Sequence, residues 1–238
     1  LFHGASLWAL KVASRIVDMV FYASIPENNA LTQALKGELY DFIAVPREKM
    51  EEYIAESDVV LIGPGLPRES GKEKGEESTR ELTRRLLKKF SKKKWVIDAG
   101  SLTEMDPEWL KELTGNVIIT PHRKEFEKLF QSRIQSANSA DRIVEEKAKE
   151  YNCIILLKGP TDIVCPPAGG CVEVSGGNEG MTKGGTGDVL AGLVAALMCK
   201  NELFLAACCG SFINKKAGES TYKRVGPYFN ASDLSDEI

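Results

Sequence analysis

The residues best suited to chemistry lie in one glycine-rich stretch of the chain, Gly176–Gly192, which reads GGNEGMTKGGTGDVLAG. The apolar run Val189–Met198 overlaps its end and predicts a buried helix. A loop that turns into a helix N-terminus presents free backbone N–H groups and the positive end of a helix dipole, so it attracts an anion. Glycines let the backbone approach that anion closely. The predicted anion-binding residues are Gly184, Gly185, Thr186 and Gly187.

Asp188 directly follows these glycines, and a carboxylate is an unexpected ligand for an anion. It is better placed as a base that takes a proton from a hydroxyl while the amides hold a phosphoryl group. The stretch fits neither common phosphate-binding motif. A dinucleotide-binding GxGxxG should follow the first strand of its unit, and a Walker A loop should end in Lys-Ser or Lys-Thr. We therefore predict phosphorylation of a hydroxyl, with Asp188 as the catalytic base.

The elements that must position this loop alternate between strands and helices along the chain. Apolar runs at 95–99, 116–120 and 153–157 predict strands, and amphipathic stretches at 78–90 and 139–151 predict helices. Such alternation predicts an α/β fold with a mostly parallel sheet. No break in composition marks a second domain, so residues 1–238 are predicted to form a single domain.

Three further predictions concern single elements. The continuous apolar run Asp58–Ile62 is typical of a strand that is buried on both faces of a parallel sheet. The segments Asp162–Cys165 and Cys171–Val174 predict a short antiparallel hairpin. Asn28–Leu35 predicts a helix that begins at an asparagine.

Residues that directly follow the predicted strands are candidates for the site, because ligands of parallel sheets bind at the carboxyl ends of the strands. Each also has a structural interpretation. Asp98 either holds a metal ion through water or caps the next turn, and Glu125 either serves a metal or phosphate or only suits a helix N-terminus. His122 either contacts a ligand or is structural. Lys158 either meets a phosphate through its side chain or contacts a nucleotide through its backbone.

The bulk composition excludes some partners. Of 238 residues, 43% are hydrophobic and 27% are charged, which is ordinary for a soluble protein. The net charge of −3 gives no general attraction to nucleic acid or to an anionic membrane. The sequence has no uninterrupted apolar stretch of about 18 residues, so no membrane span is expected.

The six cysteines form no CxxC pair, and several lie in apolar runs. We predict free or buried thiols in a cytoplasmic protein, and neither a disulfide framework nor a zinc site. Cys165 and Cys171 could face each other across the predicted hairpin, but free thiols are the favoured interpretation there too.

In combination, these motifs resemble the NAD(P)H-hydrate dehydratases, the carbohydrate-kinase-like YjeF C-terminal domain of the ribokinase-like superfamily. The main similarity is the run Asn178-x-Gly180-Met181-x-x-Gly184-Gly185-Thr186-Gly187-Asp188-Val189-Leu190-Ala191-Gly192. Further similarities follow in the family's order, namely Gly4-Ala5, Gly63-Pro64-Gly65-Leu66, Asp98-Ala99-Gly100, Thr120-Pro121-His122 with Glu125, Leu157-Lys158-Gly159 and Phe229-x-Ala231-Ser232-Asp233-Leu234. The resemblance covers essentially the whole chain.

The resemblance implies a three-layer α/β/α fold with a central, mostly parallel sheet and a short antiparallel hairpin. It also implies a repair enzyme, a lyase that acts on hydrated NADH or NADPH carrying a hydroxyl on C6 of the nicotinamide ring. Such enzymes phosphorylate that hydroxyl from ADP or ATP and then eliminate phosphate to restore NAD(P)H. Hydroxide is a poor leaving group and phosphate a good one, so phosphorylation lowers the barrier to elimination.

The resemblance further assigns roles to single residues. The residues implied to contact the hydrated dinucleotide are Ala5, Gly65, His122 and Asp188. Those implied to contact the adenine nucleotide are Lys158, Gly159, Pro160, Thr161, Asp162, Asn178 and Gly187. Phosphoryl transfer implies Mg²⁺, reached through water by Asp98 and Glu125. A homo-oligomer, and a fused or separate NAD(P)H-hydrate epimerase partner, are also expected.

Some features depart from the family pattern. Members usually begin with a strand and a glycine-rich turn before the position of Gly4, and that strand is expected to be missing here. Asp162 stands where many bacterial members have threonine, which puts a side-chain contact to the nucleotide in question. The amino-acid sequence of the glycine-rich run is more similar to that of members that use ADP than to that of members that use ATP.

Two other functions share the same loop chemistry. One is a small-alcohol kinase of the hydroxyethylthiazole-kinase type, which would use the same anion-binding loop and base. The other is a non-catalytic nucleotide-binding module, and the presence of Asp188 argues against it.

Overall fold

The computed structural model describes residues 4–24, 39, 41–67, 77–134 and 139–238. Its centre is a sheet of six strands. The first four strands pair in parallel, and each of the last two pairs antiparallel with the strand before it. Their order is β3 (Val59–Ile62), β4 (Lys94–Ile97), β5 (Val117–Ile119), β6 (Ile154–Leu157), β7 (Asp162–Cys165) and β8 (Val172–Val174). The predicted parallel sheet and its terminal hairpin are therefore confirmed.

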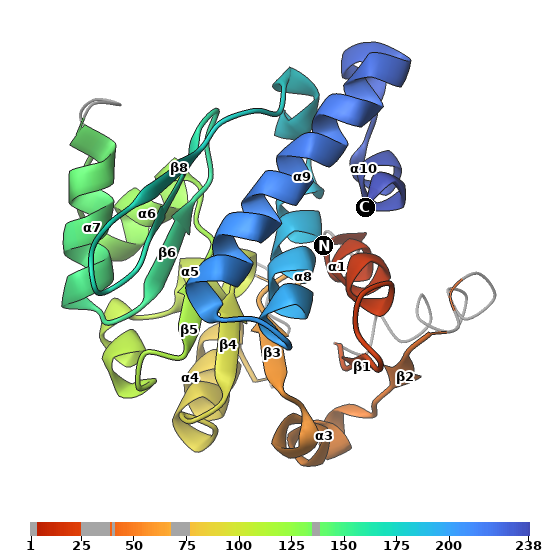
Figure 1. Ribbon diagram of the computed structural model, residues 1–238. Helices are drawn as coiled ribbons and strands as arrows, with labels where there is room; N and C mark the ends of the chain where they lie inside the picture. Colours follow the sequence, from red (N-terminus) through yellow and green to blue (C-terminus); the bar gives the residue numbers. More distant parts are fainter. Residues whose placement is uncertain (1–3, 25–38, 40, 68–76, 135–138) are drawn as a thin grey trace.

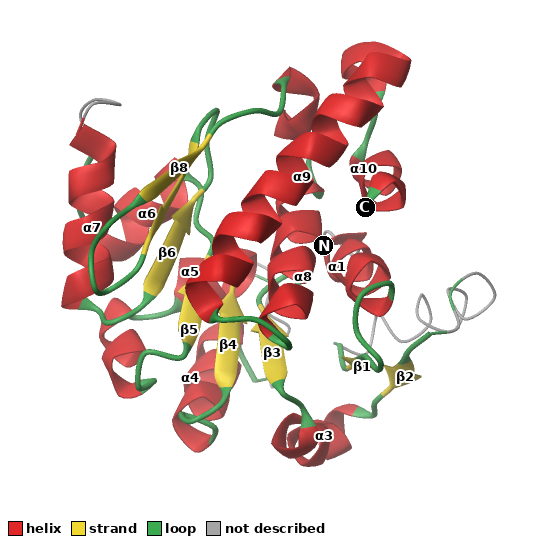
Figure 2. Cartoon of the chain, viewed as in Figure 1, coloured by secondary structure: helices red, strands yellow, loops and turns green. Residues whose placement is uncertain are grey.

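Helices cover both faces of this sheet, which makes three layers (Figures 1 and 2). One face carries α4 (Thr79–Lys89), α5 (Ala99–Glu104), the 3₁₀ helix η3 (Pro107–Glu112), α6 (Arg123–Phe130) and α7 (Ala140–Glu150). The opposite face carries α8 (Thr186–Met198) and α9 (Leu203–Val225).

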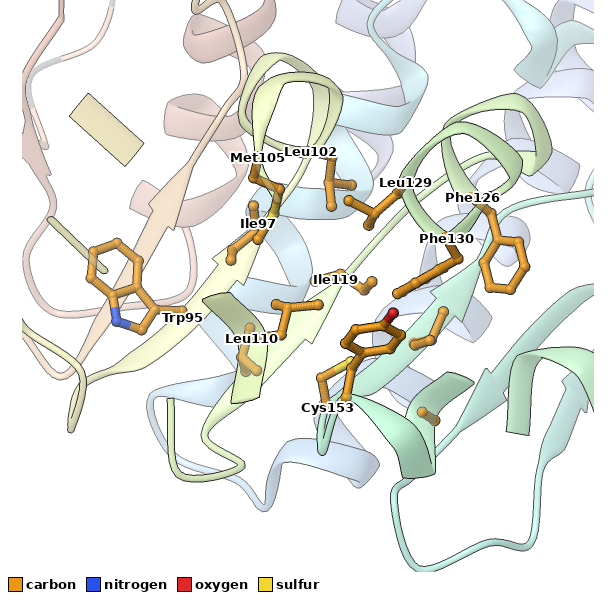
Figure 3. Close-up of a cluster of buried hydrophobic side chains, with 14 of the residues drawn as sticks. Trp95, Ile97, Leu102, Met105, Leu110, Ile119, Phe126, Leu129, Phe130 and Cys153 are labelled. Carbon is orange, nitrogen blue, oxygen red and sulfur yellow. The ribbon is translucent and has the colours of Figure 1, made fainter. Parts of the chain in front are cut away.

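The core follows from the alternation of side chains along each strand. In β4, the fully buried Trp95 and Ile97 pack among the helices of the first face, as Figure 3 shows. Val96 between them faces the other way and packs in the cluster that contains Leu190 and Val194 of α8. Both faces of β4 are covered, and its residues Trp95–Ile97 are accordingly all apolar.

The N-terminal part of the chain forms a smaller unit beside the sheet, drawn in red and orange in Figure 1. Helix α1 (Gly4–Ser14) leads to β1 (Phe21–Tyr22), which pairs in parallel with β2 (Ile43–Ala44). The 3₁₀ helix η1 (Arg47–Lys49) and α3 (Met50–Glu56) then lead to β3. The predicted helix at Asn28–Leu35 lies outside the described residues.

A cavity of about 440 Å³ separates β1 from β3, lined by both strands and by α1 and α3. For this reason the prediction that β3 is buried on both faces is wrong. Within the described residues β3 is the edge of the six-stranded sheet, and only Ile62 of this strand is buried. Val60 still packs against the core of one face, and Val59 and Leu61 pack against the core of the other, but all three stay partly exposed beside the open edge.

Local signals in the sequence account for several helix ends. Ser78 caps α4 through a reciprocal capping box with Glu81, and Asp106 caps η3 ahead of Pro107. Helix α5 is short, and Gly226, with φ of 63°, ends α9 after Val225.

The remaining short elements are the 3₁₀ helices η5 (Glu179–Thr182) and η6 (Gly226–Tyr228) and the terminal helix α10 (Ala231–Glu237). No helix among those described is long and apolar enough to span a membrane.

The interpretation of Cys165 and Cys171 as free thiols is wrong, because the two form a disulfide. They end β7 and precede β8, and the tight turn between these strands brings their Cα atoms within 4.3 Å of each other. The other four cysteines are free, as predicted, and they are Cys153, Cys199, Cys208 and Cys209.

Helix α1 packs directly on α8 through a glycine. A Cβ atom on Gly192 would lie 2.6 Å from both the Cα and the carbonyl oxygen of Ala9. We expect Gly192→Ala to lower the free energy of unfolding by about 1–3 kcal/mol, because one helix backbone must move away from the other. Chemical denaturation measures this, with Leu205→Ala on the exposed side of α9 as a control expected to change stability by less than about 0.5 kcal/mol. Equal stability of the two variants would contradict this packing.

Candidate active site

A cavity of about 1150 Å³ opens at the carboxyl edge of the parallel strands. This exceeds the usual size of a pocket for one small ligand, so it has room for two substrates. It is bordered by α1, by the segments that follow β3 to β6, by Gly176–Gly187 and by α9. Every residue predicted for the site lines this cavity except Thr161.

The glycine-rich loop ends at the N-terminus of α8, as predicted. Gly185 is the N-cap residue with φ of 96°, and a Cβ atom there would lie 2.3 Å from the ring of Trp8. Only glycine fits this conformation and this contact. The first-turn amide of Gly187 has no acceptor within the helix, so it is available to an anion. The Asp188 amide donates to the carboxylate of the same residue.

Thr186 stabilises the loop itself. Its hydroxyl lies 2.6 Å from the carbonyl oxygen of Met181 and 2.9 Å from that of Lys183. Its backbone N–H also faces the Lys183 carbonyl, at 3.4 Å. Both donors of Thr186 are thus directed at the loop, and the neighbouring Gly187 amide is left to hold a phosphoryl group.

Asp188 has the electrostatic properties of a base. Burial, together with the negative charges of Asp98 and Glu125, raises its pKa to about 7 from the ordinary 3.8, and the positive charge of Lys158 opposes this rise. A carboxylate whose pKa lies near neutrality takes up a proton more readily than an ordinary aspartate and is still half ionised near pH 7.

Lys158 follows β6 and lies between Asp98, which follows β4, and Gly187 in the first turn of α8. Its Nζ donates to Oδ1 of the buried Asp98 at 2.8 Å, and a Cβ atom on Gly187 would lie 3.2 Å from the same Nζ. Burial lowers the pKa of Lys158, but the nearby carboxylates of Asp98, Glu125 and Asp188 outweigh it and hold the pKa above its usual value. A permanent positive charge therefore lies beside the N-terminus of α8.

His122 and Glu125 form a reciprocal capping box at the start of α6. Nδ1 of His122 accepts from the Glu125 N–H at 3.2 Å, and Oε2 of Glu125 accepts from the His122 N–H at 2.9 Å. The proton of a neutral ring therefore sits on Nε2. The structural interpretation applies to both residues, yet both also line the cavity.

Asp162 is held by protein groups. Its carboxylate accepts from the Gly159 N–H at 2.8 Å and from the Ser211 hydroxyl at 2.7 Å, and it lies 3.3 Å from Nζ of Lys215. The side chain thus fixes the loop after β6, in which Gly159 and Pro160 also line the cavity.

Sequence reasoning missed three residues of α9, namely Ser211, Asn214 and Lys215. All three are buried, and the last two line the cavity. A signal was present, because polar residues at i, i+3 and i+4 of an otherwise apolar helix mark one face. That face turns towards β7 and the cavity rather than towards solvent.

The donor set for a divalent cation is limited. Asp98 and Glu125 supply carboxylate oxygens, which suit Mg²⁺. Among the residues that the structure describes, no three acidic, histidine or cysteine side chains come close enough together to hold a metal ion by themselves. These residues therefore fit a cation that takes most of its ligands from phosphates and water, as Mg²⁺ often does.

Comparison with known proteins agrees with this geometry. A family model described as NAD(P)H-hydrate dehydratase matches residues 2–238. The chain belongs to this family. It is 33% identical to the ADP-dependent (S)-NAD(P)H-hydrate dehydratase of Nitrosopumilus maritimus over 250 aligned positions, which cover all of this chain and 83% of that protein.

Other relatives of this chain are longer proteins. It is 37% identical over 192 positions to the bifunctional NAD(P)H-hydrate repair enzyme Nnr of Archaeoglobus fulgidus, which covers 80% of this chain and 36% of that protein. The Nnr protein of Methanocaldococcus jannaschii is 35% identical over the whole chain and 45% of its own length. The chain thus spans less than half of these bifunctional relatives.

Solved structures confirm the ribokinase-like three-layer fold. The ADP/ATP-dependent NAD(P)H-hydrate dehydratase of Bacillus subtilis, co-crystallised with ATP and Mg²⁺, superimposes with a TM-score of 0.76 at 22% identity. The match covers 99% of this chain and 84% of that one. A ribokinase-like protein of Enterococcus faecalis gives a TM-score of 0.78 at 21% identity, over 98% of this chain and 80% of that one.

The charge of Asp188 should govern the pH dependence of the site. If it acts as a base, kcat/KM should fall as pH drops below about 7, because protonation removes the base. Asp98→Asn should move the midpoint to lower pH by about one unit, because it removes a negative charge and leaves Lys158 unpaired. The pH profiles of kcat/KM for the wild type and for Asp98→Asn measure this shift. Any ionisation of the nucleotide phosphates affects both profiles equally. A midpoint that stays in place would contradict the electrostatic coupling.

The same pKa has a consequence for stability. The folded pKa of Asp188 lies above its unfolded value, so stability is lost as pH rises from about 4 to about 7. The buried charge costs up to about 4 kcal/mol above pH 7. Asp188→Asn should therefore raise Tm at pH 8 by several degrees, and the gain should shrink towards zero near pH 4. Thermal melts across this range measure it, and a gain that does not depend on pH would contradict it.

Proposed function

We propose that this protein restores hydrated NADH or NADPH to the reduced dinucleotide, using ADP or ATP to phosphorylate the C6 hydroxyl. The observation that carries the proposal is the position of Asp188. It stands in the first turn of α8, beside the free Gly187 amide and the Lys158 ammonium, in a cavity large enough for two substrates. Membership of the dehydratase family supplies the identity of the hydroxyl.

In the first half of the reaction, Asp188 accepts the proton of the C6 hydroxyl. The oxygen then attacks the terminal phosphorus of the donor, a new O–P bond forms, and the bond to the leaving AMP or ADP breaks. The amide of Gly187 and the charge of Lys158 stabilise the negative charge on the transferring group. A base held near neutrality suits this step, since its conjugate acid forms at little cost.

In the second half, the C6–O bond of the phosphorylated ring breaks and inorganic phosphate leaves. The adjacent ring carbon loses a proton, and the ring double bond of NAD(P)H forms. The same helix N-terminus that held the transferring phosphoryl group can hold the departing phosphate. The cavity therefore serves both halves of the reaction without rearrangement.

The two substrates are assigned to opposite sides of the α8 N-terminus. Ala5 of α1, Gly65 and His122 line the cavity, and we propose that they contact the hydrated dinucleotide. The other side is proposed for the adenine nucleotide, and its candidate contacts are Lys158, Gly159, Pro160, Asn178 and Gly187. In-line transfer needs this arrangement, with the attacking and leaving oxygens on opposite sides of the phosphorus.

Mg²⁺ is proposed to join the donor phosphates, with Asp98 and Glu125 reaching it through water. When bound, the ion neutralises phosphate charge. The relatives named bifunctional suggest that a second repair activity accompanies this one, on the same or on a separate chain.

A direct assay tests the proposal. The protein is incubated with hydrated NADH or NADPH, Mg²⁺ and either ADP or ATP, and the absorbance of the reduced nicotinamide is followed. We expect recovery with at least one donor, with one phosphate released per dinucleotide. Asp188→Asn should reduce kcat by about 10²-fold or more while nucleotide still binds, because only the proton acceptor is lost.

One control variant sharpens this assay. Ser220→Ala, which removes an exposed hydroxyl at the far end of α9, should leave turnover unchanged. No recovery with either donor would contradict the proposed function. Normal turnover by Asp188→Asn would contradict the role of Asp188 alone.

A further inference from the structure

Four oxygen atoms surround the side-chain nitrogen of Lys215 in the wall of the large cavity. Its Nζ lies 3.1 Å from the carbonyl oxygens of Gly159 and Pro160, 3.3 Å from Oδ1 of Asp162 and 3.4 Å from the carbonyl oxygen of Gly176. The lysine is almost fully buried, at 5% exposure. We call these four oxygens, and the space that they enclose, the oxygen cage.

The contacts in the oxygen cage resemble the coordination of an ion more than a set of directed hydrogen bonds. An ammonium carries three protons, so it cannot direct one at each of four oxygens. All four distances also lie near or beyond the long end of the usual range for N–H···O hydrogen bonds. The oxygen cage therefore holds a compact positive charge rather than three directed donors.

The backbone is arranged to receive this charge. Successive residues of an extended chain point in opposite directions, whereas the carbonyl groups of Gly159 and Pro160 converge on one point. Asp162 braces them, because its Oδ1 atom accepts from the Gly159 N–H at 2.8 Å and its Oδ2 atom accepts from Ser211 of α9 at 2.7 Å. These two contacts do not involve Lys215, so the oxygen cage is partly held together without the lysine.

We propose that Lys215 is a built-in monovalent cation, and that the oxygen cage is a site of the kind that binds K⁺ or NH₄⁺. In potassium channels, carbonyl oxygens replace the hydration shell of K⁺, an ion close in size to NH₄⁺. Mg²⁺ does not suit the oxygen cage, because it demands oxygens at about 2.0–2.1 Å in a regular octahedron. Asp162 supplies the negative charge, which gives a role to a carboxylate that departs from the family pattern.

The charge in the oxygen cage positions the neighbouring site. Gly159 directly follows Lys158, whose ammonium lies beside the N-terminus of α8. Gly176 begins the glycine-rich stretch. Lys215 is therefore a positioning residue that ties both segments to α9. Because the chain carries this cation itself, the oxygen cage of the wild type needs no ion from solution. The link to turnover rests on the proposed function, whereas the cation site does not.

The test empties the oxygen cage and refills it from solution. Lys215→Ala removes the ammonium and leaves room for an ion, whereas Lys215→Met removes the charge but keeps the bulk of the stem. We expect each substitution to lower Tm in sodium buffer by about 10 °C, because a buried carboxylate loses its partner. In Lys215→Ala, K⁺ or NH₄⁺ at about 0.2 M should restore about half of this loss. Lys215→Met should regain nothing. Thermal melts in chloride salts of equal ionic strength measure this.

The matched control is Lys216→Ala, which changes the next residue of α9. Lys216 is exposed and pairs with Glu219 at the surface. Its variant should show the same difference in Tm between potassium and sodium buffers as the wild type, whose oxygen cage is filled. Equal responses of Lys215→Ala and Lys215→Met to K⁺, or no response in either, would overturn the inference. If Lys215→Ala folds too poorly to melt, the yield of folded protein after refolding in each salt gives the same comparison.

Turnover separates the positioning role from the cation site. In sodium buffer, Lys215→Ala should lose about tenfold or more in kcat, because the loop that carries Lys158 is displaced. K⁺ or NH₄⁺ should restore most of this loss in Lys215→Ala but not in Lys215→Met. Recovery of Tm without recovery of kcat would contradict the positioning role. A wild type that is inactive on hydrated NADH and NADPH would contradict the proposed function, and the melts would still decide the cation site.

Discussion

The site depends on the balance of charge around a single buried lysine. Three carboxylates, those of Asp98, Glu125 and Asp188, act on one another across the carboxyl edge of the sheet, and Lys158 is the cation among them. Asp98 takes the direct ion pair with this lysine. Within the described part of the chain Asp188 has no such ion pair, and its proton affinity rises because of its burial first and of the neighbouring carboxylates second. The ends of β4 and β6 and the first turns of α6 and α8 position these four side chains.

The scaffold around that centre is built from close backbone approaches. The absence of a side chain at Gly185 leaves room for the ring of Trp8, and at Gly192 it leaves room for the backbone of α1. The first helix of the chain and the anion-binding helix therefore form one packed unit. On the other side, Lys215 joins α9 to the loop after β6. The two sides of the cavity thus differ in chemistry. Apolar packing holds the side of α1, while a buried ammonium and its carbonyl acceptors hold the side of α9.

Much of this could be predicted from the sequence, because the physics was local or periodic. The parallel strands, the loop before α8 and the caps at Ser78 and Asp106 follow from apolar runs, glycines and capping residues in sequence order. What failed depends on contacts between distant segments. The partial exposure of β3 reflects a cavity beside it, and the burial of Lys215 reflects partners more than thirty residues away. The identity of the substrate came from family resemblance, since an anion site and a base specify only that a hydroxyl is phosphorylated.

The cavity between β1 and β3 has a consequence for how the protein meets other chains. Each strand pairs on one side only within the described residues, and both line the same apolar space. A strand edge with unpaired N–H and C=O groups is a template for another strand. Here two such edges border one opening, so an extended apolar segment could form ladders on both sides at once. Such a segment would merge the small sheet and the large sheet into one continuous sheet.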